Sequence, residues 1–127
     1  MRLRSDLVAI CSATLSGGLD RHGADWDSRA ALGVVMAAGG YPANYAKGNV
    51  ITGLDVADSD TQKVFHAGTV VDGDIVTTSG GRVLCVVGLG DTVAEAAMQA
   101  YAAVDKIDWQ DVYCRRDIGH RAIAREA

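Results

Sequence analysis

A basic segment near the end of the chain is the clearest candidate for chemistry. It reads Cys114-Arg115-Arg116-Asp117-Ile118-Gly119-His120-Arg121, with adjacent arginines beside a glycine. Guanidinium groups bind phosphate oxygens two at a time, so this segment suits a phosphate group. Asp117 would hold one arginine in place or bind a sugar hydroxyl. A solvated chain end with local ion pairs explains the same residues, and the sequence leaves both interpretations open.

A glycine-rich loop is the second candidate. Gly39-Gly40-Tyr41-Pro42 directly follows an apolar run over residues 31–38. Two glycines after a strand let the backbone approach a ligand closely and leave N–H groups free for an anion or a carboxylate. The spacing is neither GxGxxG nor a P-loop, and a plain turn out of a strand is the competing interpretation.

The remaining polar residues form no recognisable catalytic set. None of His22, His66 and His120 pairs with another at metal-ligand spacing, and no Ser-His-Asp order indicates a nucleophile. The three cysteines lie far apart and form no CxxC pair, which argues against a structural zinc site and a disulfide scaffold. We interpret them as thiols of a cytoplasmic protein in a reducing compartment.

Length and charge limit the classes of function. The chain has 127 residues, the size of one domain, and a formal net charge of −4. A nucleic-acid module usually carries a basic face and a positive balance, so we expect no nucleic-acid partner. No apolar stretch reaches the roughly 20 residues that a membrane span needs, so we expect no membrane partner either.

The elements that must position these candidates are mostly strands in the middle of the chain. Residues 31–38 are a short apolar run that ends at glycine, which favours a buried strand, with a buried helix as the competitor. Strands are predicted over residues 64–71, 75–78 and 82–88, with a hairpin turn at Asp72-Gly73. We interpret these three strands as a meander.

Helices are predicted at both ends of this β-rich region. Residues 3–15 place Leu7, Ile10 and Leu15 on one apolar face, and a polar linker follows over residues 19–28. Thr92 and Glu95 form a capping box that begins a second amphipathic helix. The last 16 residues begin as strand or loop and end as a short helix from about residue 118. The pattern predicts an α+β fold.

Four blocks of sequence resemble the C-terminal part of the phosphoribosylamine–glycine ligase family, members of the ATP-grasp superfamily. The blocks match in order and in spacing, and the resemblance covers all 127 residues. They are RAALGVVMAAGGYP at residues 29–42, KVFHAGT at 63–69, GGRVLCV at 80–86 and CRRDIG at 114–119.

The resemblance implies a fold and an activity. Residues 1–27 would be the last helix and linker of an ATP-grasp domain, and residues 28–127 a small β-rich domain of the single-hybrid-motif type with one or two helices. Family members join phosphoribosylamine and glycine with ATP, giving glycinamide ribonucleotide, ADP and phosphate. ATP and Mg²⁺ or Mn²⁺ are their cofactors, and the ligands for these lie before the segment that this chain resembles. We therefore expect the chain to be inactive alone, to hold no cofactor, and to need the N-terminal portion of the ligase as its partner.

By the same resemblance, the two candidate sites take part in substrate binding. Arg115, Arg116 and Arg121 would face the active-site cleft and hold the substrate phosphate. Gly39, Gly40 and Tyr41 would line the pocket for glycine or phosphoribosylamine, and no residue is assigned a catalytic or metal-binding role.

We considered two other functions, of which one remains open. The apolar face of residues 3–15 would make the chain an interaction module that dimerises through its N-terminal helix. A carrier domain of the biotinyl type is excluded, because none of Lys47, Lys63 and Lys106 lies between methionines on a hairpin turn.

Overall fold

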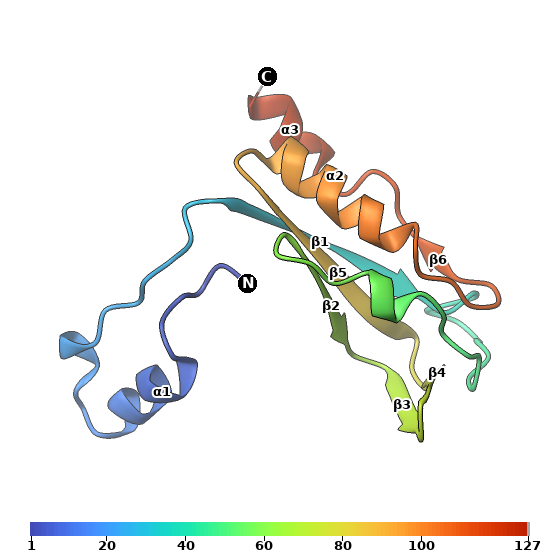
Figure 1. Cartoon of the computed structure of the whole chain (residues 1–127), viewed down its shortest axis with the longest axis horizontal. Coiled ribbons are helices and arrows are strands. Elements are labelled where there is room, and N and C mark those ends of the chain that lie inside the picture. Colours follow the sequence, from blue (N-terminus) through green and yellow to red (C-terminus); the bar gives the residue numbers. More distant parts are fainter. Residues whose placement is uncertain (127) are drawn as a thin grey trace.

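The chain folds around a four-stranded antiparallel sheet with one helix, α2, across one face (Figure 1). This computed structural model describes residues 1–126. A separate two-stranded sheet, β3–β4, projects from one end of the main sheet, whose strand order is β2-β5-β1-β6. The elements in chain order are α1 (Leu7–Leu15), η1 (Leu19–Arg21), β1 (Ala30–Ala37), η2 (Leu54–Val56), β2 (Gln62–His66), β3 (Thr69–Asp72), β4 (Ile75–Thr78), β5 (Arg82–Gly90), α2 (Val93–Val104), β6 (Tyr113–Cys114) and α3 (His120–Glu126). The α+β fold class predicted from the sequence is confirmed.

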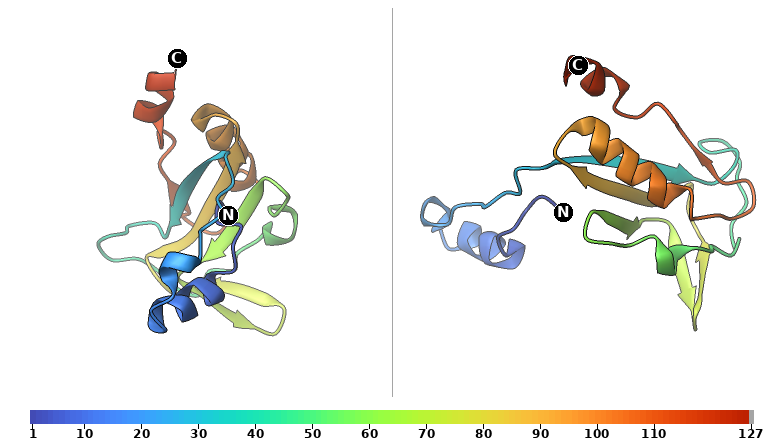
Figure 2. Two further views of the ribbon diagram at one scale, coloured as in Figure 1. Left: turned by 90° about the vertical axis from the view of Figure 1, so that its left-hand side faces the viewer. Right: turned by 45° about the horizontal axis from the view of Figure 1, so that its top comes forward.

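The chain consists of a packed region and an N-terminal region that extends from it. Residues 30–126, which we call the body, contain the sheet, α2 and α3. Residues 1–28, which we call the arm, extend to one side of the body in Figure 1 and in the right-hand view of Figure 2. Arg29 lies at the joint between them.

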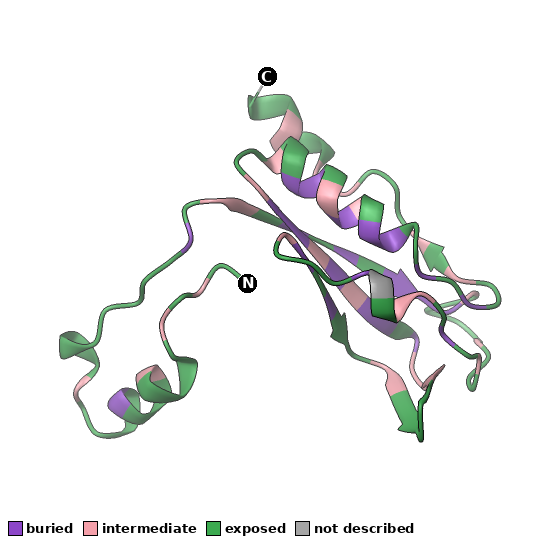
Figure 3. Ribbon diagram, viewed as in Figure 1, coloured by how far each residue is buried: buried purple, intermediate pink, exposed green. Residues whose placement is uncertain are grey.

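The apolar run over residues 31–38 is a strand and not a helix. β1 pairs with β5 from Ala30↔Gly90 to Ala37↔Arg82, and its end also pairs with β6. Side chains alternate along a strand, and burial alternates with them along most of β1 (Figure 3). Leu32, Val34 and Met36 enter the core beneath α2, so the neighbouring side chains Gly33, Val35 and Ala37 belong to the opposite face of the sheet.

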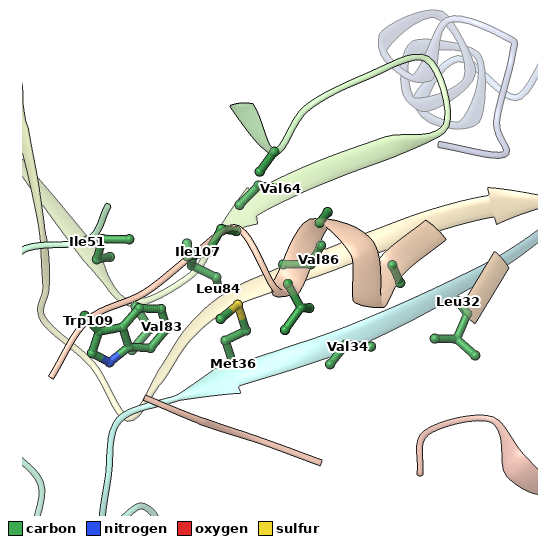
Figure 4. Packing of buried hydrophobic residues seen from close by; sticks show 14 of the residues in the cluster. Leu32, Val34, Met36, Ile51, Val64, Val83, Leu84, Val86, Ile107 and Trp109 are labelled. Carbon is green, nitrogen blue, oxygen red and sulfur yellow. The ribbon is translucent and has the colours of Figure 1, made fainter. Parts of the chain in front are cut away.

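A β-bulge closes one end of the core. Met36 pairs with Leu84 and Ala37 pairs with Arg82, so Val83 is an extra residue on β5. Val83 and Leu84 are both fully buried, and Figure 4 shows Val83 beside Trp109 and Leu84 near Met36. The bulge therefore places two consecutive side chains in the core and turns Arg82 toward the other face.

The predicted meander is wrong in its pairing. The predicted strand over residues 64–71 breaks at Ala67 and Gly68, whose N–H groups both donate to Val83 O at 3.0 Å. β2 stays in the main sheet beside β5, whereas β3 turns out to pair with β4 around the predicted Asp72-Gly73 turn. The break forms because a Cβ on Gly68 would lie 2.6 Å from Arg82 O, a contact that only glycine permits.

The second predicted helix is confirmed as α2. The Thr92 hydroxyl accepts a hydrogen bond from Glu95 N at 3.1 Å, while the Glu95 carboxylate reaches back to Asp91 N at 2.9 Å. This is a capping box shifted by one residue on its return bond. The alanine-rich face of α2 packs closely on β5, since a Cβ on Gly88 would lie 2.2 Å from Ala96 O.

The first helix is shorter than the sequence predicts. Asp6 caps α1 by accepting from Val8 N at 2.7 Å and Ala9 N at 3.2 Å, so the helix begins at Leu7 and not at residue 3. Residues 2–4 are extended because they pair with residues 25–27 of the predicted linker. In α1 only Ala13 is buried (Figure 3), so its predicted apolar face lies largely in solvent.

Candidate functional site

One pocket brings together residues from both sequence candidates. It lies on the face of the sheet opposite α2, has a volume of about 290 Å³, and we call it the sheet-face pocket. Its floor comes from β1, and its walls come from the loop after β1, the start of β5 and the segment after β6. The lining residues are Gly33, Val35, Ala37, Tyr41, Arg82, Tyr113, Arg115 and Ile118.

Tyr41 reaches this pocket because two glycines shape the loop around it. The chain leaves β1 with Ala38 N donating to Gly81 O at 2.9 Å, which holds the loop beside the start of β5. The Tyr41 ring then lies on Gly81, where a Cβ would come within 2.1 Å of its Cδ2 atom. Gly40 has φ +90°, and a Cβ there would lie 2.3 Å from Asn44 O. Both positions therefore require glycine for steric reasons.

Gly39 lies outside the sheet-face pocket. It packs against Asp111, where a Cβ would approach the Asp111 Cβ and O atoms to 2.6 Å, and it lines a neighbouring pocket of about 310 Å³ with Asn49 and Gln110. The Asn49 side chain donates to Gln110 O at 3.3 Å across this second pocket. Of the predicted residues Gly39, Gly40 and Tyr41, Tyr41 therefore lines the sheet-face pocket, whereas Gly39 lines the neighbouring pocket.

Arg115 is held in the sheet-face pocket by two sets of contacts. Its Nε and Nη2 donate to the two carboxylate oxygens of Asp117 at 2.9 and 2.7 Å. The Tyr101 hydroxyl donates to Arg115 O at 2.9 Å and accepts from Ile118 N at 3.1 Å, which fixes the segment to α2. Hydrogen bonding to Arg115 lowers the pKa of Asp117, and the same bond raises the pKa of Arg115. The guanidinium is therefore oriented before any ligand arrives.

Arg116 points to the opposite side of the segment. Its Nη1 donates to Asp105 at the end of α2 at 2.6 Å, and its guanidinium lies 5.6 Å from the centre of the Tyr101 ring. It lines a different pocket of about 500 Å³ with Asp108 and Cys114. Neighbouring side chains of an extended chain point in opposite directions, so the adjacent arginines do not form one cradle.

Arg121 lies with Arg115 and not with Arg116. It shares a shallow pocket of about 370 Å³ with Arg115, Asp117, His120 and Arg125. The imidazole of His120 lies 2.9 Å from Asp117 O through Nδ1. Arg115, Arg121 and Arg125 therefore share one surface that Arg116 does not line, and Arg115 is common to this surface and to the sheet-face pocket.

Sequence reasoning missed Arg82 and Tyr113. Both pair with Ala37, Arg82 from β5 and Tyr113 from β6, so they occupy one row across three strands. Arg82 forms no salt bridge with any residue of the described range 1–126, whereas Arg115 and Arg116 are both paired. The sequence did not reveal Arg82 because the face of the sheet to which it points depends on the bulge in β5.

Comparison with known proteins identifies the family. The family described as "Phosphoribosylglycinamide synthetase, C domain" matches residues 31–121. The ligases called phosphoribosylamine–glycine ligase from Allochromatium vinosum and Vibrio cholerae are 64% and 60% identical to this chain over 126 residues, 99% of its length. The chain belongs to the phosphoribosylamine–glycine ligase family. It spans 29% of the length of each of these two relatives, as their C-terminal part.

A solved structure supports the same assignment. The crystal structure of phosphoribosylamine–glycine ligase from Thermotoga maritima is 38% identical, with a TM-score of 0.60, over 69% of this chain and 21% of that one. The family match runs from β1 to the first turn of α3 and contains every residue of the sheet-face pocket. The pocket is thus built from the part of the chain that defines the ligase family.

In residues 1–126, no three His, Cys, Asp or Glu side chains gather to hold a metal ion. His22 and His66 are exposed and lie within hydrogen-bond distance of Gly18 O and the Thr69 hydroxyl. None of the described helices is both long and apolar enough for a bilayer crossing.

Proposed function

We propose that this chain supplies the substrate-side C-terminal domain of a phosphoribosylamine–glycine ligase in purine biosynthesis. The observation that carries the proposal is 64% identity to such a ligase along almost the whole chain. In the proposed reaction, the carboxylate of glycine takes the terminal phosphoryl group of ATP and becomes an acyl phosphate. The amine of phosphoribosylamine then attacks the carbonyl carbon and phosphate leaves, so the products are glycinamide ribonucleotide, ADP and phosphate.

The role of this chain in that reaction is to bind substrate and not to activate it. ATP and Mg²⁺ are the cofactors of the proposed activity, but the described residues offer no donor set for a divalent cation. We therefore assign the phosphoryl-transfer step to the rest of the ligase, and we expect this chain to be inactive alone. The free cysteines suit the cytoplasm, where this pathway would run.

The arm and the body take different parts in this proposal. We assign residues 1–27 to the end of an ATP-grasp domain and residues 28–127 to the C-terminal domain. Support comes from the exposed apolar side chains of α1, which suit a helix that packs on another domain. Arg115 and Arg121 are the arginines that we assign to substrate, together with Tyr41 of the glycine loop.

A chimera tests the proposal directly. The 126 matched residues of the Allochromatium vinosum ligase are replaced by this chain, and formation of glycinamide ribonucleotide and ADP is measured with all three substrates. We expect turnover that depends on phosphoribosylamine, glycine and ATP, and none from this chain alone. A folded chimera without ligase activity would contradict the proposal, as would ADP release by the isolated chain.

We propose a second function on a separate observation, namely that the chain associates through α1. Leu7, Val8 and Leu15 are 60%, 73% and 91% exposed, an unusual state for apolar side chains of one helix. Sedimentation velocity over a wide concentration range tests this idea with the chain and its Leu7→Glu, Leu15→Glu variant. Self-association that the double variant abolishes supports the interaction module, and a monomer at every concentration excludes it.

A further inference from the structure

We propose that Arg82 is a substrate-binding residue, and that it acts with Arg115 as a two-armed clamp for the phosphate of a sugar phosphate. This inference rests on the proposed function for the identity of the substrate, a ribose phosphomonoester. It assigns to Arg82 the place that the sequence pattern suggests for Arg116.

The sheet places the two arginines on either side of β1. Arg82 begins β5 and pairs with Ala37, while Tyr113 of β6 pairs with the same residue from the other side. Arg115 follows two positions after Tyr113, and both arginines line the sheet-face pocket. Strands lie about 4.8 Å apart, so the two backbones are separated by roughly 10 Å with β1 between them. Two long side chains that converge from this distance can grip one phosphate over the floor of β1.

The two guanidinium groups have free donors for this task. An arginine carries five N–H donors, and Asp117 takes only one from Nε and one from Nη2 of Arg115. Arg82 has no salt-bridge partner among residues 1–126, so its whole charge is available. Asp117 fixes one arm of the clamp, and Arg82 supplies the uncompensated positive charge.

The rest of the pocket suits a small sugar phosphate. Its volume of about 290 Å³ is at the lower end of ligand pockets, and its floor is the apolar surface of Gly33, Val35 and Ala37. Ionic hydrogen bonds strengthen above an apolar surface that excludes water. Tyr41 and Tyr113 add ring surface and hydroxyl groups at the rim, which fits the ribose end of the ligand.

Arg116 does not serve as the second arm. Its guanidinium is engaged by Asp105 and lies over the Tyr101 ring, on the other side of the segment. Rotating it toward the sheet-face pocket would break both contacts. The structure thus separates two arginines that are adjacent in sequence and joins two that are 33 positions apart.

The first test measures binding of ribose 5-phosphate by the chain itself. Amide shifts in an NMR titration report the affinity of the chain and of Arg82→Gln, Arg82→Lys, Arg115→Gln and Arg116→Gln, with unphosphorylated ribose as a second probe. We expect Arg82→Gln and Arg115→Gln to weaken binding about tenfold to a hundredfold, as the loss of one or two charge-assisted hydrogen bonds predicts. Arg82→Lys keeps the charge without the fork, so its loss is smaller.

The matched controls decide between the arginines. Arg116→Gln and Arg21→Gln, the latter on the exposed arm, should bind ribose 5-phosphate like the unaltered chain, and ribose should not bind. Arg82 is exposed, so its variants are expected to keep the melting temperature of the parent. Loss of binding in Arg116→Gln together with normal binding in Arg82→Gln overturns the proposal. Failure of the unaltered chain to bind ribose 5-phosphate overturns it as well.

The chimera separates this inference from the proposed function. In an active chimera, Arg82→Gln should raise the KM for phosphoribosylamine at least tenfold while the KM values for ATP and glycine stay unchanged. An active chimera that is indifferent to Arg82→Gln refutes the clamp and leaves the ligase assignment intact. An inactive chimera, with binding of ribose 5-phosphate that depends on Arg82, refutes the ligase assignment and supports the anion clamp.

Discussion

Two leucines show how differently the arm and the body are held. Leu15, at the end of α1, is 91% exposed, whereas Leu84, on β5, is 0% exposed. The body is held by apolar burial between α2 and the sheet, from Leu32 at one end to Trp109 at the other. Ala13 is the one apolar side chain that the arm, residues 1–28, buries, and hydrogen bonds join its two ends.

The polar joint of the arm centres on Asp27. Its carboxylate is buried, and Arg29 donates to it through Nε at 3.0 Å and Nη2 at 2.7 Å. Arg4 donates at 3.3 Å, and Asp27 N donates to Arg2 O at 2.6 Å. The contrast suggests that the body is stable by itself, whereas the arm keeps its shape through charge and is free to present α1 to another surface.

The largest expected effect comes from comparing the same Leu→Ala substitution in the body and in the arm. Leu84→Ala should lower the free energy of unfolding by about 2–5 kcal/mol, because it leaves a cavity in the core. Leu15→Ala should change it by less than about 0.5 kcal/mol, as is usual for exposed positions. Urea denaturation followed by circular dichroism measures both. Equal losses at the two sites would show that the arm is packed in solution.

Two glycines give a smaller and more local effect. Gly81→Ala places a methyl group within 2.1 Å of the Tyr41 ring, so we expect a loss of about 1–3 kcal/mol from overpacking and an outward turn of the ring. Gly23→Ala, on the arm, has no atom within 4 Å of the new Cβ and should be neutral. Thermal denaturation measures stability, and the Tyr41 ring resonances report the pocket. Unchanged ring resonances in Gly81→Ala would mean that Tyr41 does not lie on Gly81.

Local patterns of the sequence were sufficient for the elements but not for their pairing. The strand over residues 31–38, the turn at Asp72-Gly73 and the cap at Thr92 follow from nearby residues alone. The break at Gly68 does not, because it depends on the close approach of Gly80 and Arg82, which only the folded chain brings together. The amphipathic pattern of α1 marked an apolar face without revealing whether anything covers it.

The candidate site was predictable only in part, for the same reason. Arg115 and Tyr41 were found because they lie in recognisable motifs, and the structure brings both to the sheet-face pocket. Arg116 looked equivalent to Arg115 in sequence, but alternation along an extended segment sends it to Asp105. Arg82 carried no local signal, since its direction depends on the bulge at Val83.

The smallest expected effect is confined to the arm and concerns Asp27. Hydrogen bonds from Arg29 hold the pKa of this carboxyl far below its usual range. A carboxyl whose pKa is depressed in the folded state stabilises that state fully above the unfolded pKa of about 3.9, and the contribution declines as the pH falls from there through the folded pKa. The arm should therefore keep its structure from pH 7 down to about pH 3, below the pH at which an unpaired aspartate is half protonated.

NMR amide shifts of residues 2–4 and 25–27 across this pH range report whether the two segments are paired. Asp27→Asn should give the shifts of unpaired segments at every pH, with little change in the shifts of the body. Asp20→Asn is the matched control, because the Asp20 carboxylate lies 3.9 Å from Arg21 with both side chains 80% exposed, and such a pair contributes little. A transition of the arm near pH 4 in the unaltered chain, or an arm unaffected by Asp27→Asn, would show that the joint does not depend on this carboxylate. In that case the backbone pairing of residues 2–4 with residues 25–27 would have to hold the arm without the carboxylate, and the division between a charge-held arm and a core-held body would fail.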